Sequence, residues 1–298
     1  MARVLVALGL LFLAGIGPQA RAAEAPENDA FRHADSPVLD AVSASISTAA
    51  TATNVVAIAA GASHTCAVTT DGGVVCWGSN WAGELGDGTN THRSTPAPVS
   101  GLFSGVTAIA AGAAHSCAVT DAGGATCWGW NESGQLGDGT TTSRSTPVAV
   151  LGLESGVRSI AAGSYHTCAV TLAGGVLCWG RNDRGQLGDG TTTSRSTPMA
   201  VSGLDGGVEA IDVGDEYACA VTTAGRVLCW GAGGPLGDGT TTDRWTPVPV
   251  MGLDAEVASV AAGAGHTCAI TTAGAVWCWG SNWSGQLGDG SMSRRLAP

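Results

Sequence analysis

The chain has 298 residues, among them 46 glycines, and a formal net charge of -11, with arginine as its only basic residue besides histidine. Nucleic-acid affinity depends on clustered Lys and Arg at the phosphates, and anionic membranes repel an acidic surface. The composition therefore argues against nucleic acid and membranes as partners and favours a protein, a carbohydrate or a cation.

The first 22 residues are typical of a secretory signal. Arg3 provides a short basic head, an apolar run extends from Val4 to Ile16, and Ala20 to Ala22 form a small-x-small cleavage site. The apolar run is shorter than the about 20 residues of a membrane span. We therefore expect cleavage near Ala22 and a secreted, periplasmic or cell-surface protein without membrane insertion.

Residues 23–54 form a leader that contains one strand-like segment. Residues 36–42 resemble Thr197 to Val201, which close the third copy of a repeat unit, whereas the last copy reaches only Pro298, aligned with Pro198. We predict that residues 36–42 supply the missing strand and close a ring, which removes two free sheet edges. Residues 43–54 are the expected linker. The sequence leaves open an open arc or a fragment of a longer propeller.

Residues 55–298 contain five copies of a unit of about 51 residues. In the third copy, four short apolar segments lie between turn residues, without a helical period. They are Val157 to Ala162, Thr167 to Thr171, Val176 to Trp179 and Pro198 to Val201. Repeats of this length with four short strands are typical of propeller blades. We therefore expect an all-β propeller of four-stranded blades.

Ten cysteines form five pairs with members ten residues apart. The pairs are Cys66 and Cys76, Cys117 and Cys127, Cys168 and Cys178, Cys219 and Cys229, and Cys268 and Cys278. A turn centred on Asp71 places Cys66 and Cys76 opposite each other, with Cα atoms about 4.5 to 5.5 Å apart, which suits a disulfide. Exported proteins favour such bridges, and zinc ligands are spaced more closely, so we predict one hairpin disulfide per blade.

The segment from Ala161 to Gly190 closely resembles the regulator-of-chromosome-condensation repeat. It contains a Gly, a His-Thr pair, a Gly turn, Trp-Gly-x-Asn and Gly-Gln-Leu-Gly in the family's order. The chain is thus identified as a bacterial, secreted member of this family, which implies four-stranded blades, usually seven. The family's exchange factors act on a small GTPase through a long extra hairpin. No copy here carries that insertion, so nucleotide exchange is not expected.

Residues shared by the copies are interpreted as structural. Four histidines occupy one slot of separate copies, and we expect each to hydrogen-bond its own turn. They are His64, His115, His166 and His266. Five Gly-Asp-Gly segments are interpreted as Asp-stabilised turns, because one carboxylate per loop is few for calcium. Their aspartates are Asp87, Asp138, Asp189, Asp238 and Asp289.

Five tryptophans that recur before a glycine are expected in the core between blades. They are Trp77, Trp128, Trp179, Trp230 and Trp279. The sequence contains no nucleophile elbow, phosphate loop or zinc-protease helix motif. We expect no enzyme activity and no cofactor.

The fourth copy differs most from the others. Asp212 replaces the residue in the Ala161 slot, Glu216 that in the Tyr165 slot, and Tyr217 that in the His166 slot, and two residues are missing near Gly233. This copy is the candidate for a binding site that the other copies lack. The site would be either an acidic anchor for a partner or a cation site, with Asp212, Asp215 and Glu216 as weak metal candidates. Drift within a degenerate repeat is the alternative.

A second variable set is rich in Trp and Arg, which dominate protein interfaces, and aromatic rings also stack on sugars. The candidate binding residues are Trp81, Trp130, Tyr165, Arg181, Arg184, Glu216 and Trp283. We expect a noncatalytic extracellular or periplasmic protein that binds a protein or carbohydrate with one propeller face. Enzyme inhibition is one version, because some secreted β-lactamase inhibitor proteins are similar in fold.

The alternative is a structural repeat protein of the cell surface or matrix, and less favoured are an exchange-factor-like regulator and an enzyme. A binding face predicts that Trp81, Trp130 and Trp283 cluster, whereas a structural repeat protein predicts that they scatter.

Overall fold

The computed structural model describes residues 54–298 except residue 254. The expected signal, residues 1–22, and the expected ring-closing strand, residues 36–42, lie outside the described residues. Within the described part, every regular element is a β-strand, and no helix that could cross a membrane is found there.

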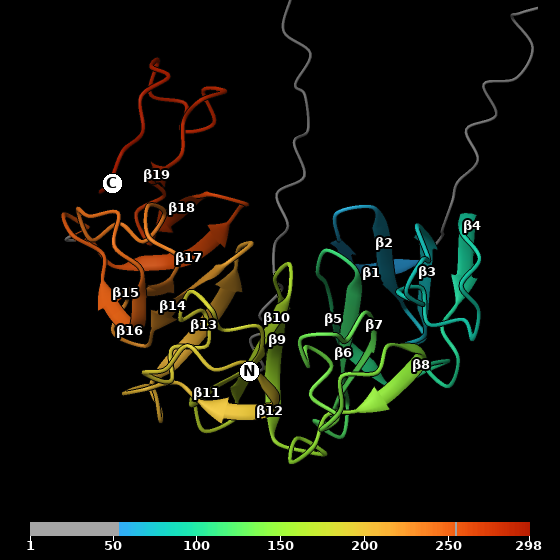
Figure 1. The fold of residues 1–298 in the computed structure, drawn as a ribbon. Helices are drawn as coiled ribbons and strands as arrows, with labels where there is room; N and C mark the ends of the chain where they lie inside the picture. Colours follow the sequence, from blue (N-terminus) through green and yellow to red (C-terminus); the bar gives the residue numbers. More distant parts are fainter. Residues whose placement is uncertain (1–53, 254) are drawn as a thin grey trace, which may run out of the picture. The chain divides into compact units, whose positions relative to one another are not determined.

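The strands form five antiparallel sheets that follow one another in chain order, here called blades 1 to 5 (Figure 1). Blade 1 contains β1 (Val55–Ala60), β2 (His64–Thr69), β3 (Val74–Gly78) and β4 (Arg93–Pro98). Blade 2 contains β5 (Val106–Ala111), β6 (His115–Thr120), β7 (Ala125–Gly129) and β8 (Arg144–Ala149). Blade 3 contains β9 (Val157–Ala162), β10 (His166–Thr171), β11 (Val176–Gly180) and β12 (Arg195–Ala200).

Blade 4 contains β13 (Val208–Val213), β14 (Tyr217–Thr222), β15 (Val227–Gly231) and β16 (Arg244–Pro249). Blade 5 contains β17 (Val257–Ala262), β18 (His266–Thr271) and β19 (Val276–Gly280), and a single bridge joins Gly280 to Arg295. That bridge occupies the place where β12 begins to pair in blade 3, because Gly180 there pairs with Arg195. The five-blade all-β architecture is as expected.

The fourth strand of each complete blade begins earlier than the sequence predicts. In blade 3 it starts at Arg195, three residues before Pro198, and ends at Ala200, so Val201 follows the strand. The pairing shifts register between Cys178 and Gly180, which lets Arg195 reach the end of β11. The sequence prediction was based on apolar residues, and it missed the start of β12 because the first paired residue of that strand is Arg195.

All five predicted disulfides are present, each within one hairpin. They join Cys66 to Cys76, Cys117 to Cys127, Cys168 to Cys178, Cys219 to Cys229, and Cys268 to Cys278. The two cysteines of each pair are directly opposed partners of the second and third strands. Their Cα atoms are 4.1 Å apart, slightly closer than the spacing expected from the sequence. Each bridge therefore joins two strands of one blade and leaves the contacts between blades noncovalent.

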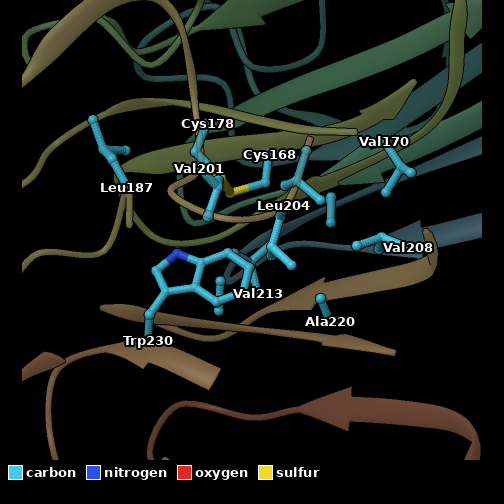
Figure 2. Packing of buried hydrophobic residues seen from close by; sticks show 13 residues of the cluster. Cys168, Val170, Cys178, Leu187, Val201, Leu204, Val208, Val213, Ala220 and Trp230 are labelled. Atoms are coloured by element: carbon cyan, nitrogen blue, oxygen red, sulfur yellow. A yellow bond between two sulfur atoms is a disulfide. The ribbon is translucent and has the colours of Figure 1, made fainter. Parts of the chain in front are cut away.

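Successive blades pack through a repeated apolar interface, of which Figure 2 shows one. The Cys168–Cys178 bridge, Val201 and Leu204 of the third repeat pack against Val213, Ala220 and Trp230 of the fourth. The Trp230 indole is fully buried, and its Nε1 donates to Gln186 O of the preceding repeat at 3.0 Å. Trp128, Trp179 and Trp279 are equally buried and make the same kind of bond. The expected role of these tryptophans between blades is confirmed for all but Trp77, which stays half-buried because no described blade precedes it.

Two of the four shared histidines, His64 and His115, hydrogen-bond to the next blade, which corrects the expectation that each bonds its own turn. His64 Nε2 lies 2.8 Å from Ser116 Oγ, and His115 Nε2 lies 2.9 Å from Thr167 Oγ1, each in the next blade. Burial lowers the pKa of His115 to about 3 and that of His166 to about 4, so both rings are neutral near pH 7. These contacts join residues 52 positions apart, and the pattern within one copy did not reveal them.

Both ends of the described array expose positions that are core elsewhere. Val276 in blade 5 is 62% exposed, whereas Val176 at the equivalent position of blade 3 is 1% exposed. Val55 in blade 1 is 38% exposed, whereas its counterpart Val106 is 5% exposed. Each interface buries one face from each of two blades, so the first and last blades each keep one apolar face uncovered by described residues.

Candidate functional site

The loop after the third strand of a blade carries the variable residues, and an asparagine organises it. In blade 3, Asn182 Nδ2 donates to Asp189 Oδ1, Thr191 O and Thr193 O, each at 3.1 Å. Its Oδ1 accepts from Leu187 N at 2.9 Å. Asn80, Asn131 and Asn282 make the equivalent bonds in blades 1, 2 and 5. One buried amide thus replaces the backbone pairing that the irregular loop lacks.

The Gly-Asp-Gly segments complete the same loops, and their interpretation as turns is confirmed. Asp189 Oδ1 accepts from Thr191 N at 2.9 Å and from Thr191 Oγ1 at 2.7 Å, and Arg195 lies 3.4 Å from Oδ2. Burial alone would raise the pKa of Asp189, but these hydrogen bonds and the arginine charge hold it below its usual value. The sequence analysis missed the arginine, although it recurs six residues after each of these aspartates.

The fourth blade departs from this loop design. Gly233 stands at the Asn182 position, and its amide N donates to Asp243 Oδ1 at 2.9 Å, as Asn182 N donates to Ser194 Oγ. The stabilising amide side chain is absent here, and the loop is two residues shorter. A cavity of about 370 Å³ lies beside the shortened loop. Its lining includes Ser164, Tyr165, Asp215, Glu216, Ser281 and Arg294. We call this space the fourth-blade cavity.

The three weak metal candidates do not converge. Asp215 Oδ1 accepts from Ser164 Oγ at 2.7 Å, whereas Glu216 pairs with Arg181 at 3.3 Å. The Asp212 carboxylate accepts instead from its neighbour's amide, Val213 N, at 3.0 Å and, across the blade boundary, from Ala262 N at 2.8 Å. Among the described residues, no group of three or more His, Cys, Asp or Glu is arranged to hold a metal ion.

Burial raises the pKa of Asp212 to about 6, more strongly than its two amide donors lower it. Tyr217, in the histidine slot, is also a packing residue. Its hydroxyl lies 2.6 Å from His266 O and 3.0 Å from Thr267 Oγ1 in blade 5, and burial raises its pKa. The fourth copy's unusual Asp212 and Tyr217 therefore join blades 4 and 5. Asp215, Glu216 and Tyr217 line the fourth-blade cavity, and Asp212 does not.

Five candidate binding residues lie in one continuous chain of contacts across blades 2 to 4. The rings of Trp130 and Tyr165 meet edge to face at 6.4 Å, and Arg181 Cζ lies 5.6 Å from the Tyr165 centroid. Arg181 pairs with Glu216, and Arg184 lies 4.0 Å from the other Glu216 oxygen. We call these residues, Trp130, Tyr165, Arg181, Arg184 and Glu216, the aromatic–arginine surface. It continues through Arg184 to Asp243 at 3.2 Å.

The remaining two candidates, Trp81 and Trp283, are 78% and 76% exposed. Trp81 packs against His92 of its own loop, with ring centroids 4.6 Å apart. Its carbonyl accepts from Asn90 Nδ2 at 2.9 Å. Among the described residues, the aromatic contacts place Trp130, but neither of these two tryptophans, in the aromatic–arginine surface.

A comparison with known protein families agrees with the repeated blades of the structure. The family described as the RCC1-like domain matches residues 16–298. The chain belongs to the RCC1-like domain family. Its repeats therefore have the family's order, and the hairpin cysteines and the shortened fourth-blade loop are features of this member's sequence.

Relatives with the same repeats include larger proteins. The ultraviolet-B receptor UVR8 of Arabidopsis thaliana is 36% identical over 184 residues, 60% of this chain and 42% of UVR8. The human E3 ubiquitin-protein ligase HERC2 is 36% identical over 184 residues, 60% of this chain and 4% of HERC2. This RCC1-like chain thus spans less than half the length of either relative.

Solved structures show the same fold. Human WBSCR16 matches with a TM-score of 0.73 at 26% identity, over 82% of this chain and 66% of that chain. Prp20p of Saccharomyces cerevisiae matches with a TM-score of 0.71 at 23% identity, over 82% of this chain and 62% of that chain. The second likeness shows the fold alone.

Three residues of this RCC1-like site escaped the sequence analysis: Asp243, Ser281 and Arg294. Each lies in a loop that looked unremarkable in its own copy. The signal that points to them is the two-residue shortening near Gly233, because Asp243 bonds Gly233 within that loop and Ser281 and Arg294 line the cavity beside it.

Proposed function

We propose that the chain is a noncatalytic extracellular or periplasmic binding protein that holds a protein partner on the aromatic–arginine surface. The observation that carries the proposal is the unbroken contact chain from Trp130 through Tyr165 and Arg181 to Glu216. Five disulfides support an oxidising location, because such bridges persist outside the cytoplasm.

The chemistry of this surface suits a protein better than a sugar. Trp, Tyr and Arg are the residue types that supply most of the binding energy at protein interfaces. An ion pair with Glu216 holds Arg181 beside the Tyr165 ring, and Arg184 pairs with Asp243, so a partner meets a preorganised surface. The fold supports the same choice, since the structure of Prp20p is described together with its binding to Gsp1p and histones. Inhibition of an enzyme is one form that such binding takes.

Carbohydrate binding is a second candidate, favoured by the two exposed indoles, Trp81 and Trp283. Exposed aromatic faces stack on sugar rings. A glycan array probed with the wild type and with a double variant, Trp81→Ala with Trp283→Ala, separates the candidates. Carbohydrate binding predicts glycan signals that the double variant loses, whereas protein binding predicts no glycan signal for either.

The test of protein binding is cross-linking capture from the medium in which the protein is naturally present, followed by affinity measurement on the captured partner. We expect Arg181→Ala to weaken binding about 30-fold, because it removes a hot-spot arginine and leaves Glu216 with a weaker pairing. Trp130→Ala should weaken it by a similar factor.

The control is Leu172→Ala, which removes another exposed side chain of blade 3, on the β10–β11 turn. The control should bind as the wild type does. Equal affinity of all three variants and the wild type would show that the partner docks elsewhere and would overturn the proposal.

A further inference from the structure

The fourth-blade cavity is a local feature of this chain and not a general property of its blades. Blades 1, 2, 3 and 5 fill the equivalent loop with an asparagine side chain, whereas blade 4 has Gly233 and two fewer residues. The backbone of Thr241 and Thr242 packs directly against Gly233, and the cavity of about 370 Å³ lies beside this shortened loop. Its volume is within the range of sites that hold small molecules, about 300 to 1,000 Å³.

A positive charge lines the cavity because Arg294 cannot play the role of its counterparts. In blades 1 to 4 the equivalent residue accepts a hydrogen bond from the loop backbone, as Ser194 Oγ accepts from Asn182 N and Asp243 Oδ1 from Gly233 N. A guanidinium has only donors and cannot accept that bond. Arg294 lines the cavity instead, while the next residue, Arg295, makes the usual ion pair with its loop aspartate, Asp289.

A negative charge lines the same cavity from the neighbouring blade. Asp215 lies in the β13–β14 turn, where the other copies have Ala or Ser. Its described partner is the neutral Ser164 hydroxyl, whereas Arg181 and Arg184 offset the charge of the adjacent Glu216. Among the ion pairs within the described residues, neither Asp215 nor Arg294 takes part, so both residues line the cavity without a charged partner.

We propose that the fourth-blade cavity binds a zwitterionic small molecule of the amino-acid class, with its ammonium at Asp215 and its carboxylate at Arg294. A ligand with only a positive charge would leave Arg294 unmatched, and one with only a negative charge would leave Asp215 unmatched. The hydroxyl groups of Tyr165 and Ser281 add neutral hydrogen-bonding partners on the same lining. This small-molecule site goes beyond the protein-binding function proposed above and does not require it.

The test is isothermal titration of the full chain with single probes. L-Alanine, L-lysine and L-glutamate carry both charges, whereas putrescine lacks the carboxylate and succinate lacks the ammonium. We expect at least one of the three amino acids to bind at least about tenfold more tightly than putrescine and succinate, because charge-assisted hydrogen bonds form at both ends. No amino-acid binding at millimolar concentration, or equal binding of putrescine or succinate, would overturn the proposal.

Charge-removing variants locate the site. Asp215→Asn and Arg294→Gln should each weaken amino-acid binding about tenfold or more. The controls Asp121→Asn and Arg226→Gln remove exposed charges outside the cavity lining and should bind as the wild type does. Unchanged binding in both cavity variants would place the ligand elsewhere and refute the assignment.

Two further variants separate this proposal from the proposed protein binding and from misfolding. The first variant replaces Gly233, Gly234 and Pro235 by the Asn-Asp-Arg-Gly-Gln segment of blade 3, which already forms the equivalent loop in that blade. The longer loop should fill the cavity and abolish amino-acid binding. Trp130→Ala should leave amino-acid binding unchanged while it weakens partner capture. Retained amino-acid binding in the loop replacement would contradict the cavity as the site.

Discussion

Blades 3 and 4 share a framework of paired strands and differ most in their loops and turns. Both have four strands in the same register, a bridge between opposed cysteines and a tryptophan whose indole reaches back to the preceding repeat. They differ in the loop after the third strand, in the turn before the second and at three paired strand positions, Asp212, Tyr217 and Ala218. The strand pairing is kept through these changes, and the candidate site is built mainly from the loops and turns that differ.

The loops after the third strands of blades 3 and 4 differ in how their backbone groups are hydrogen-bonded. In blade 3, Asn182 fills the loop interior and satisfies its backbone. In blade 4 the bonds of the asparagine side chain are lost, Gly233 N still donates to Asp243, and the backbone of Thr241 and Thr242 closes against Gly233. A polar cavity lies beside this shorter loop, and the following predictions test the contrast.

The largest expected effect is on the blade 3 loop. Asn182→Ala removes the donors to Asp189, Thr191 O and Thr193 O and leaves Leu187 N without its acceptor. We expect the free energy of unfolding to fall by about 3 kcal/mol, because several buried polar groups lose their partners. Urea denaturation measures this.

The control for the loop is Asp183→Ala in the same segment. It removes an exposed ion pair with Arg181, and such pairs are worth less than about 1 kcal/mol. If both variants lost the same small amount, the asparagine would not organise the loop, and the contrast with blade 4 would disappear.

Next in size are the disulfides, for which the blades should behave alike. One double variant replaces Cys168 and Cys178 by Ser, and the other replaces Cys219 and Cys229 by Ser, so each opens a loop of the same length. We expect each to lower the free energy of unfolding by about 2 kcal/mol. A loss in blade 4 that exceeded the loss in blade 3 by more than about 1 kcal/mol would show that the shortened loop weakens the whole blade.

The Asp212 carboxylate should make the stability of blade 4 depend on pH. Its folded pKa of about 6 lies above the ordinary value of 3.8, so the folded protein binds the proton more tightly than the unfolded chain. This contribution to stability is fully present below about pH 4 and is lost as pH rises through about 6.

Thermal unfolding of Asp212→Asn at pH values from 4 to 8 checks this. The variant should lose less stability than the wild type over that range, whereas the control Asp121→Asn, at an exposed position, should follow the wild type. Parallel curves for Asp212→Asn and the wild type would refute the assignment.

The smallest effect concerns the hydroxyl that blade 4 lacks. Ala218 stands at the Thr167 position and carries no hydroxyl, and His166 Nε2 is buried without a hydrogen-bond partner among the described residues. Ala218→Thr should supply the bond that Thr167 gives His115 and raise the free energy of unfolding by about 1 kcal/mol. Ala218→Val has the same shape without the hydroxyl and should give no gain. Equal stability of the Thr and Val variants would contradict the role of the hydroxyl.

The framework was predictable because its causes lie within one copy of the repeat. The ten-residue spacing of Cys168 and Cys178 and the short apolar segments around them define a hairpin by themselves. The histidine contacts were assigned wrongly, because their partners lie in the next copy. The start of the fourth strand was missed, because Arg195 is charged. Its backbone pairs with Gly180, and its side chain forms an ion pair with Asp189 of the preceding loop.

The site was predictable only in part. Divergence of the fourth copy drew attention to Asp215 and Glu216, and the variable Trp and Arg positions drew attention to Trp130 and Arg181. The role of Arg294 depends on how the shortened loop of blade 4 lies beside a loop of blade 5, and that of Asp243 on its bond to Gly233 within the shortened loop. The arrangement of these loops in space could not be predicted from a single sequence.

The bridges also determine how the chain responds to a pulling force. Each disulfide locks a hairpin within one blade, and all ten cysteines are used in this way. Under tension, the blades can separate along their noncovalent interfaces and the long loops can straighten, while the residues between each cysteine pair cannot extend. A stretched chain would therefore be shorter than its residue count allows, and reduction would release the additional length in five equal steps, one for each hairpin.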